Sequence, residues 1–205
     1  MTPRMTDASS LSHLAGILEF LRAAERLKVT TRSAYTSDGS PESVAEHSWR
    51  LCLMALVLRE DFPDIDIGKL VAMCVVHDLG EAIGGDVPAP EQARRLARDP
   101  TATKSVQERE DLLTLLAPLP ETVRSEITAL WDEYEAASSP EARVAKALDK
   151  LETILQHTQG ANPPGFDYRF NLGYGRAFTA GHPVIVRLRE LLDTETARLA
   201  GSAKG

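Results

Sequence analysis

The chain has 205 residues and a formal net charge of −7, with 43% hydrophobic and 26% charged residues. This composition is typical of a water-soluble globular protein, and the length favours a single domain. The negative net charge argues against a surface that binds a nucleic acid polymer, whereas a small phosphorylated ligand needs only a local cluster of basic residues.

The sequence shows no pattern typical of membrane insertion or secretion. No run approaches the roughly 18 consecutive apolar residues that a membrane span needs, and residues 1–10 lack the apolar stretch of a signal peptide. We therefore expect a cytoplasmic protein without a membrane partner. Cys52 and Cys74 fall in apolar helical patterns, so we expect buried, reduced thiols and no cysteine-rich zinc motif or disulfide framework.

Helical periodicity dominates the chain, and no segment shows a convincing strand pattern. In chain order, helices are predicted over approximately residues 10–28, 43–60, 67–81, 101–116, 121–136, 139–158 and 183–199. Segments rich in Gly, Pro, Ser and Asp predict loops over residues 30–41, 84–90 and 160–174.

Local signals fix two of the helix starts. Ser43 and Glu46 have the spacing of a capping box, and Pro140 follows Ser139 as a proline at the first helical position. The elements together predict an all-α fold: one compact helical domain of about six to seven main helices over residues 11–199. The segments 1–10 and 200–205 are expected to be flexible.

Three of the predicted helices carry polar residues toward the interior. An apolar run over residues 70–76 leads into His77 and Asp78, and burying this pair without partners would cost a few kcal/mol. His47 continues the apolar spacing of its helix, and Asp149 lies at the edge of an apolar stripe. Imidazole and carboxylate groups are good ligands for divalent cations, so these four residues predict a metal site with open coordination positions.

Two carboxylates follow the His-Asp pair. Glu81 projects from the same side of the helix end and is placed to orient or deprotonate a water molecule. Asp86 follows two glycines that let the backbone turn back, and it suits a general acid or base or a contact to a substrate hydroxyl.

Each of these residues also has a purely structural explanation. An inward histidine is commonly a hydrogen-bonded core residue, and Asp149 fits an exposed helix charge. Glu81 and Asp86 fit a solvated helix end and a turn. The coincidence of such residues on three helices favours the metal site.

The motifs and their order resemble the H…HD…D signature of the HD-domain metal-dependent phosphohydrolases, and within that superfamily the 5'-deoxynucleotidases. The matching segments are Ser43-Val44-Ala45-Glu46-His47, the stretch from His77 to Pro88, and Leu148-Asp149-Lys150-Leu151-Glu152. Arg26-Leu27-Lys28 with Arg32 is similar to the family's entrance segment. The resemblance covers most of residues 11–193.

The resemblance implies a role for each matching residue. The metal ligands would be His47, His77, Asp78 and Asp149, and the bound ion would be Co, Mn, Mg, Zn or Fe. Glu81 would position the attacking water, and Asp86 would sit against the sugar and assist catalysis. The substrate-binding residues would be Arg32 for the phosphate, with Ser33, Asp86, Val87 and Pro88. Some bacterial members have a tryptophan directly after the arginine, where this chain has Ser33. The resemblance therefore does not indicate whether the enzyme selects deoxyribose over ribose.

The implied activity is hydrolysis of (deoxy)nucleoside 5'-monophosphates to nucleoside and phosphate by a metal-dependent 5'-nucleotidase, with a homodimer as the family's assembly. One alternative is an HD-type hydrolase of another phosphoester, such as a cyclic nucleotide, a guanosine alarmone or a nucleoside triphosphate. A second alternative is a non-catalytic helical binding module. All proposed ligands are present, which argues against a module that has lost its site.

Overall fold

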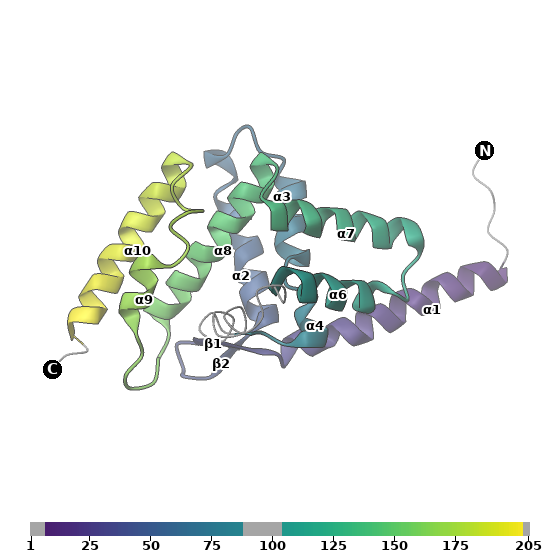
Figure 1. The fold of residues 1–205 in the computed structure, drawn as a ribbon, viewed down its shortest axis with the longest axis horizontal. Helices are drawn as coiled ribbons and strands as arrows, with labels where there is room; N and C mark the ends of the chain where they lie inside the picture. The colour runs from purple at the N-terminus through teal and green to yellow at the C-terminus, as the bar shows by residue number, and fades with distance from the viewer. Residues whose placement is uncertain (1–6, 88–103, 203–205) are drawn as a thin grey trace.

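The computed structural model describes residues 7–87 and 104–202 (Figure 1). Seven of the helices within these residues have ten or more residues, which confirms the all-α class. The helices are α1 (Asp7–Ala24), α2 (Val44–Val57), α3 (Ile67–Val76), α4 (Glu81–Gly84), α6 (Lys104–Leu116), α7 (Glu121–Ala136), α8 (Pro140–Gln159), α9 (Tyr168–Gly173) and α10 (Pro183–Ser202). Among them, none is long and apolar enough to cross a membrane.

Helix α8 lies at the centre of the packing and contacts α2, α3, α7 and α10 (Figure 1). Leu148 and Leu151 on its apolar face are fully buried and join one core cluster with α2 and α3. A second cluster around Leu112 and Leu116 connects α6 with α4 and α7. Because α2, α3 and α8 meet in the first cluster, polar residues on their inner faces are brought together.

Both helix starts that the sequence predicted are confirmed. Ser43 caps α2: its hydroxyl accepts a hydrogen bond from the Glu46 N–H at 3.2 Å, and Glu46 Oε2 accepts one from the Ser43 N–H at 2.7 Å. Ser139 caps α8 by accepting from the Ala142 N–H at 3.1 Å, with Pro140 at the start of the helix. A cap of this kind stabilises a helix by about 1 kcal/mol, so the positions of His47 and Asp149 are set locally.

The predicted loop over residues 30–41 is wrong in part. β1 (Thr31–Tyr35) and β2 (Pro41–Ser43) pair as a two-stranded antiparallel sheet. The hairpin is anchored to the end of α8, where the Gln156 amide donates to the Tyr35 carbonyl oxygen. Strands this short and polar carry no alternating apolar pattern, so contacts with a distant segment decide their conformation.

The helix predicted over residues 67–81 is interrupted. α3 ends at Val76, and His77 and Asp78 lie in the turn that leads to α4. Gly80 in this turn approaches α6 so closely that an added Cβ would lie 2.7 Å from a backbone oxygen of that helix. The turn therefore depends on a tertiary contact that the apolar run does not reveal.

Other boundaries also differ from the predicted ones. α1 begins at Asp7 and α10 ends at Ser202, so helix occupies part of both terminal segments that were expected to be flexible. The short helix α9 lies inside the loop predicted over residues 160–174. Both cysteines are free thiols; Cys74 is fully buried as expected, whereas Cys52 is only partly buried.

Candidate metal centre

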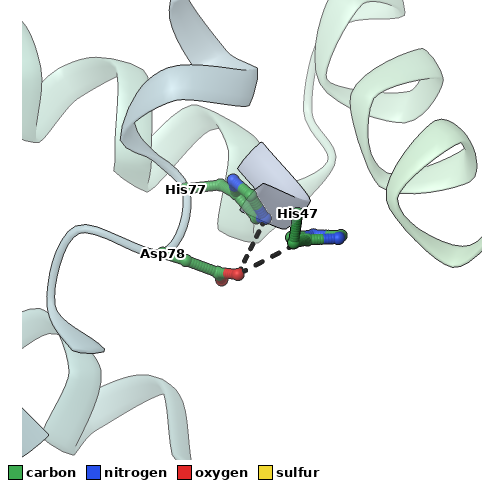
Figure 2. Close-up of side chains that lie close together, drawn as sticks. All are labelled: His47, His77 and Asp78. Carbon is green, nitrogen blue, oxygen red and sulfur yellow. Dashed lines mark ion pairs between the residues drawn. The ribbon is translucent and has the colours of Figure 1, made fainter. Parts of the chain in front are cut away.

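The side chains of His47, His77 and Asp78 converge just beyond the end of α3 (Figure 2). One potential ligand atom from each residue lies within 4.8 Å of the others. Asp78 Oδ2 is 3.0 Å from His77 Nε2 and 3.9 Å from His47 Nε2. Three of the four residues expected at a metal site therefore meet in space.

Asp149 joins this cluster from α8. Its Oδ1 atom is 3.3 Å from His47 Nε2, while Oδ2 accepts hydrogen bonds from the Tyr134 hydroxyl at 3.0 Å and from Lys150 Nζ at 2.7 Å. The residue is only 5% exposed, which excludes an exposed helix charge. The two donors on Oδ2 leave Oδ1 directed at the His47 imidazole.

Both imidazole rings are oriented through their Nδ1 atoms. His47 Nδ1 contacts the buried carboxylate of Glu152, and His77 Nδ1 is 3.0 Å from the Cys74 carbonyl oxygen. The two Nε2 atoms are buried and have no hydrogen-bond partner within the described residues. Histidines that bind metals commonly donate the other ring N–H to a carboxylate or a carbonyl. Two such nitrogens beside two carboxylates fit a divalent cation.

A second acidic group lies behind His47. Potential ligand atoms of Glu42, His47 and Glu152 also lie within 4.8 Å of one another. Arginines neutralise this group: Arg50 Nη2 is 2.6 Å from Glu152 Oε1, and Arg32 Nε is 3.5 Å from Glu42 Oε2. The guanidinium groups already balance the negative charge of Glu42 and Glu152. These two carboxylates therefore serve to orient His47 and Arg32.

Buried charges shift pKa values in the cluster. Burial and the charge of Arg32 lower the pKa of His47, but Glu152 and Asp149 outweigh them and raise it to about 9. Burial favours a higher pKa for Asp78, yet the neighbouring His77 and Arg32 hold that pKa well below its usual range. Because imidazole binds metals only in its neutral form, His47 can either carry the extra proton or bind a cation, but not both.

A cavity of about 260 Å³ opens onto the cluster. Its wall includes His77, Asp78 and Asp149. The expected catalytic and substrate-binding residues that the structure describes also line it: Arg32, Ser33, Glu81, Asp86 and Val87. Pro88 lies outside the described residues. The structure thus brings the expected catalytic and substrate residues to one cavity.

Arg32 enters the cavity wall from β1. Its Nη1 atom is 3.3 Å from Asp78 Oδ2, and Nη2 donates to the Thr153 hydroxyl at 3.1 Å. The side chain is only 12% exposed. A guanidinium held in this way beside a cation site is suited to phosphate, because its planar fork matches phosphate oxygens.

The two further carboxylates come from α4 and the turn after it. Glu81 is the first residue of α4 and is 3% exposed. Gly85 ends the helix with φ +75°, a backbone conformation that side-chain-bearing residues rarely adopt, and Asp86 follows it. The turn expected after two glycines is therefore present, and it brings Asp86 to the cavity.

Sequence reasoning missed the residues that hold the cluster in place. Trp131 is one of them: its indole N–H donates to the His77 carbonyl oxygen at 3.0 Å and fixes the turn. A signal existed for Glu152, which lies four residues after the buried Leu148 and so shares its face. The remaining supports are Glu42, Arg50, Tyr134 and Thr153.

Known proteins are similar to this chain in sequence and in architecture. A family model described as HD domain matches residues 24–184. A 5'-deoxynucleotidase HDDC2 from Mus musculus is 36% identical over 186 residues, covering 88% of each chain, and the Homo sapiens protein of that name is 35% identical, covering 87% of this chain and 85% of its own. The crystal structure of a predicted metal-dependent phosphohydrolase from Magnetospirillum magnetotacticum is 29% identical with a TM-score of 0.74, covering 91% of this chain and 96% of that one. The chain therefore belongs to the HD-domain family.

Proposed function

We propose that this chain is a divalent-metal-dependent 5'-deoxynucleotidase, which hydrolyses deoxynucleoside 5'-monophosphates to deoxynucleosides and inorganic phosphate. The observation that carries the proposal is the pair of buried Nε2 atoms of His47 and His77, which face Asp78 and Asp149 beside the Arg32 guanidinium. The relatives named 5'-deoxynucleotidase match most of the chain, which supports the same activity.

The proposed ligands are His47, His77, Asp78 and Asp149. A divalent cation bound there supplies Lewis acidity toward the phosphate and a strong nucleophile at neutral pH. A mixed set of imidazoles and carboxylates accepts several ions, so Co, Mn, Mg, Zn and Fe are all candidates, and metal supply in the cell selects among them.

The other cavity residues take complementary roles. Glu81, a buried carboxylate on the wall, holds the attacking water in line with the phosphorus and accepts its proton. Arg32 donates N–H groups to the phosphoryl oxygens and offsets the negative charge that develops on them. Asp86 accepts a hydrogen bond from a sugar hydroxyl, and Ser33 and Val87 border the sugar.

Hydrolysis of a substrate panel, measured by chromatography of all products with an assay for inorganic phosphate, tests this proposal. The panel contains matched ribo- and deoxyribonucleoside 5'-monophosphates, a 3'-monophosphate, a cyclic nucleotide, a guanosine alarmone and a nucleoside triphosphate. We expect release from the deoxynucleoside 5'-monophosphates with Co, Mn or Mg, and less from the ribonucleotides. Phosphate release from none of the 5'-monophosphates under these metals would contradict the proposal, and hydrolysis only of another phosphoester, seen as its own product in the chromatography, would identify a different HD-type hydrolase.

We also propose a homodimer formed through α1. Leu11, Leu14, Leu18 and Leu21 recur at alternating spacings of three and four residues, and they are 50% to 68% exposed. Such a stripe is typical of a helix that packs on another helix. The double substitution Leu14→Lys with Leu18→Lys should give a monomer in sedimentation analysis, whereas Leu191→Lys on α10 should not. A monomeric wild-type chain would contradict the dimer.

A cytoplasmic location stays a prediction from the sequence.

A further inference from the structure

Two aromatic side chains at the end of α9 line the cavity that holds the candidate metal centre. Phe170 lies in α9, and Tyr174 directly follows its last residue and donates its backbone N–H to the Phe170 carbonyl oxygen at 3.1 Å. Their ring centroids are 5.3 Å apart, with an angle of 33° between the ring planes. Phe170 is 42% exposed and Tyr174 is partly exposed. The cavity therefore has an accessible aromatic wall beside its polar cluster.

The other aromatic rings of this cavity, within the described residues, are already engaged. Trp131 is 2% exposed and donates its indole N–H to the His77 carbonyl oxygen. Tyr134 is 5% exposed and donates its hydroxyl to Asp149. Neither of these two offers a free ring face, so a flat apolar part of a ligand would meet Phe170 and Tyr174.

Helix α9 is held firmly in its position between α8 and α10 (Figure 1). Arg189 of α10 is 4% exposed, and its Nη2 atom donates to the Asn171 carbonyl oxygen at 2.7 Å while Nη1 donates to the Tyr174 carbonyl oxygen. His157 of α8, which also lines the cavity, contacts the Asn171 side chain at 2.8 Å between Nδ1 and Oδ1. A six-residue helix has little stability of its own, so these contacts fix the aromatic pair.

The aromatic pair lies near the proposed metal ligand Asp149, with Lys150 between them. Lys150 Nζ is 2.7 Å from Asp149 Oδ2 and 5.4 Å from the centroid of the Tyr174 ring. Gly175 leaves room for this lysine, because an added Cβ would lie 2.6 Å from the Lys150 Cβ. The Lys150 ammonium group thus contacts the ligand cluster and also lies near the Tyr174 ring, so the cluster and the aromatic pair are within the length of one nucleotide of each other.

We infer that Phe170 and Tyr174 form the nucleobase subsite of this enzyme. The inference rests on the proposed 5'-deoxynucleotidase activity and adds the part of the substrate that this aromatic pair recognises. Every nucleobase has a π face, and stacking on an aromatic side chain is strong while tolerating different bases. The pair therefore binds the base of any deoxynucleoside 5'-monophosphate and favours nucleotides over sugar phosphates that lack a base.

The experiment compares a nucleotide with the same substrate lacking its base. Phosphate release is measured for deoxyadenosine 5'-monophosphate and for 2-deoxyribose 5-phosphate, using wild type, Phe170→Ala, Tyr174→Ala and Phe170→Trp. We expect each alanine variant to lower kcat/KM for the nucleotide by about 10-fold and to leave kcat/KM for the sugar phosphate unchanged. Phe170→Trp should keep the preference for the nucleotide, because tryptophan also presents a ring face.

Phe178→Ala is the matched control. Phe178 is 40% exposed, close to the value for Phe170, but it lines a different cavity between α8 and α10. This variant should hydrolyse both substrates as wild type does. Equal losses on both substrates in the alanine variants, or no loss on the nucleotide, would overturn the base subsite while leaving the proposed function intact. Failure of wild type to hydrolyse the nucleotide would overturn both.

Discussion

The buried carboxylate of Glu152 on α8 contacts Nδ1 of His47 on α2, although the two residues are 105 positions apart. Arg50 pairs with the other carboxylate oxygen of Glu152, with Nε at 2.7 Å from Oε1. The contact fixes the rotation of the imidazole, so that Nε2 faces Asp149 at 3.3 Å. Glu152 is therefore a positioning residue for a proposed metal ligand.

Glu152→Ala should weaken metal binding by about 10- to 100-fold, the usual effect of removing a carboxylate that orients a ligating histidine. Glu152→Gln, whose amide oxygen still accepts from Nδ1, should weaken it less. Isothermal titration with Mn or Co measures both. The control is Glu190→Gln on α10, an exposed residue paired with Arg187. Wild-type metal affinity in Glu152→Ala would exclude the positioning role.

The affinity for metal should depend on pH through His47. Its pKa is raised from the ordinary 6.5 to about 9, so below that pH a binding cation must displace a proton. Affinity should therefore rise about tenfold per pH unit up to about pH 9 and level off above it. Titration in two buffers of different ionisation enthalpy should show the release of one proton.

A variant outside the cluster provides the control for this dependence. The ring of His182 packs on Phe62, away from the proposed ligands, so His182→Gln should show the same pH profile as wild type. An affinity that stays constant between neutral pH and pH 9 in wild type would show that His47 does not exchange a proton for the metal.

Arg32→Lys should lower kcat/KM for a nucleotide by roughly 10- to 100-fold, because a hydrogen bond to a charged group contributes about 1.5–3 kcal/mol. A lysine keeps the charge but cannot contact Asp78, Thr153 and phosphate with one planar fork. Steady-state kinetics measures the loss, with Arg26→Lys on the surface as the control. Unchanged kinetics in Arg32→Lys would show that the Arg32 guanidinium does not bind the phosphate.

Gly85→Ala should reduce activity through the backbone. The φ angle of +75° at this position strains any residue with a Cβ, at a cost of about 1–2 kcal/mol, and relief of the strain would move Asp86. Gly39→Ala is the matched control, because Gly39 has φ +87° at the hairpin tip, away from the turn before Asp86. Both variants should lose unfolding free energy, but only Gly85→Ala should lose kcat/KM. Equal kcat/KM values for Gly85→Ala and Gly39→Ala would show that the position of Asp86 does not matter for catalysis.

Local signals in the sequence were enough to predict the two helices that carry His47 and Asp149. The capping box at Ser43 and the N-cap at Ser139 set the starts of these helices, and both depend only on residues within three positions. The inward placement of His47 and Asp149 then follows from helical spacing. These features could be predicted because they need no knowledge of the rest of the chain.

The hairpin, the end of α3 and the supports of the ligands could not be predicted in the same way. Tyr35 is held by Gln156, and Gly80 meets the backbone of α6, contacts that link distant parts of the chain. Arg50 could not be distinguished from a surface arginine, because its partner Glu152 lies 102 positions away. Tertiary contacts determine the hairpin, the end of α3 and the supporting residues. Neither residue spacing nor local propensity indicates them.

In the proposed function, His47, His77, Asp78 and Asp149 hold the metal that hydrolysis requires. The most direct test is phosphate release from a deoxynucleoside 5'-monophosphate by chelator-treated protein, as Co or Mn is added back. Wild type should be inactive after chelation and recover with added metal, whereas His77→Ala, which keeps the backbone contact to Trp131, should bind less metal and stay inactive. Full activity of the chelated wild type, or wild-type metal content and activity in His77→Ala, would contradict the claim.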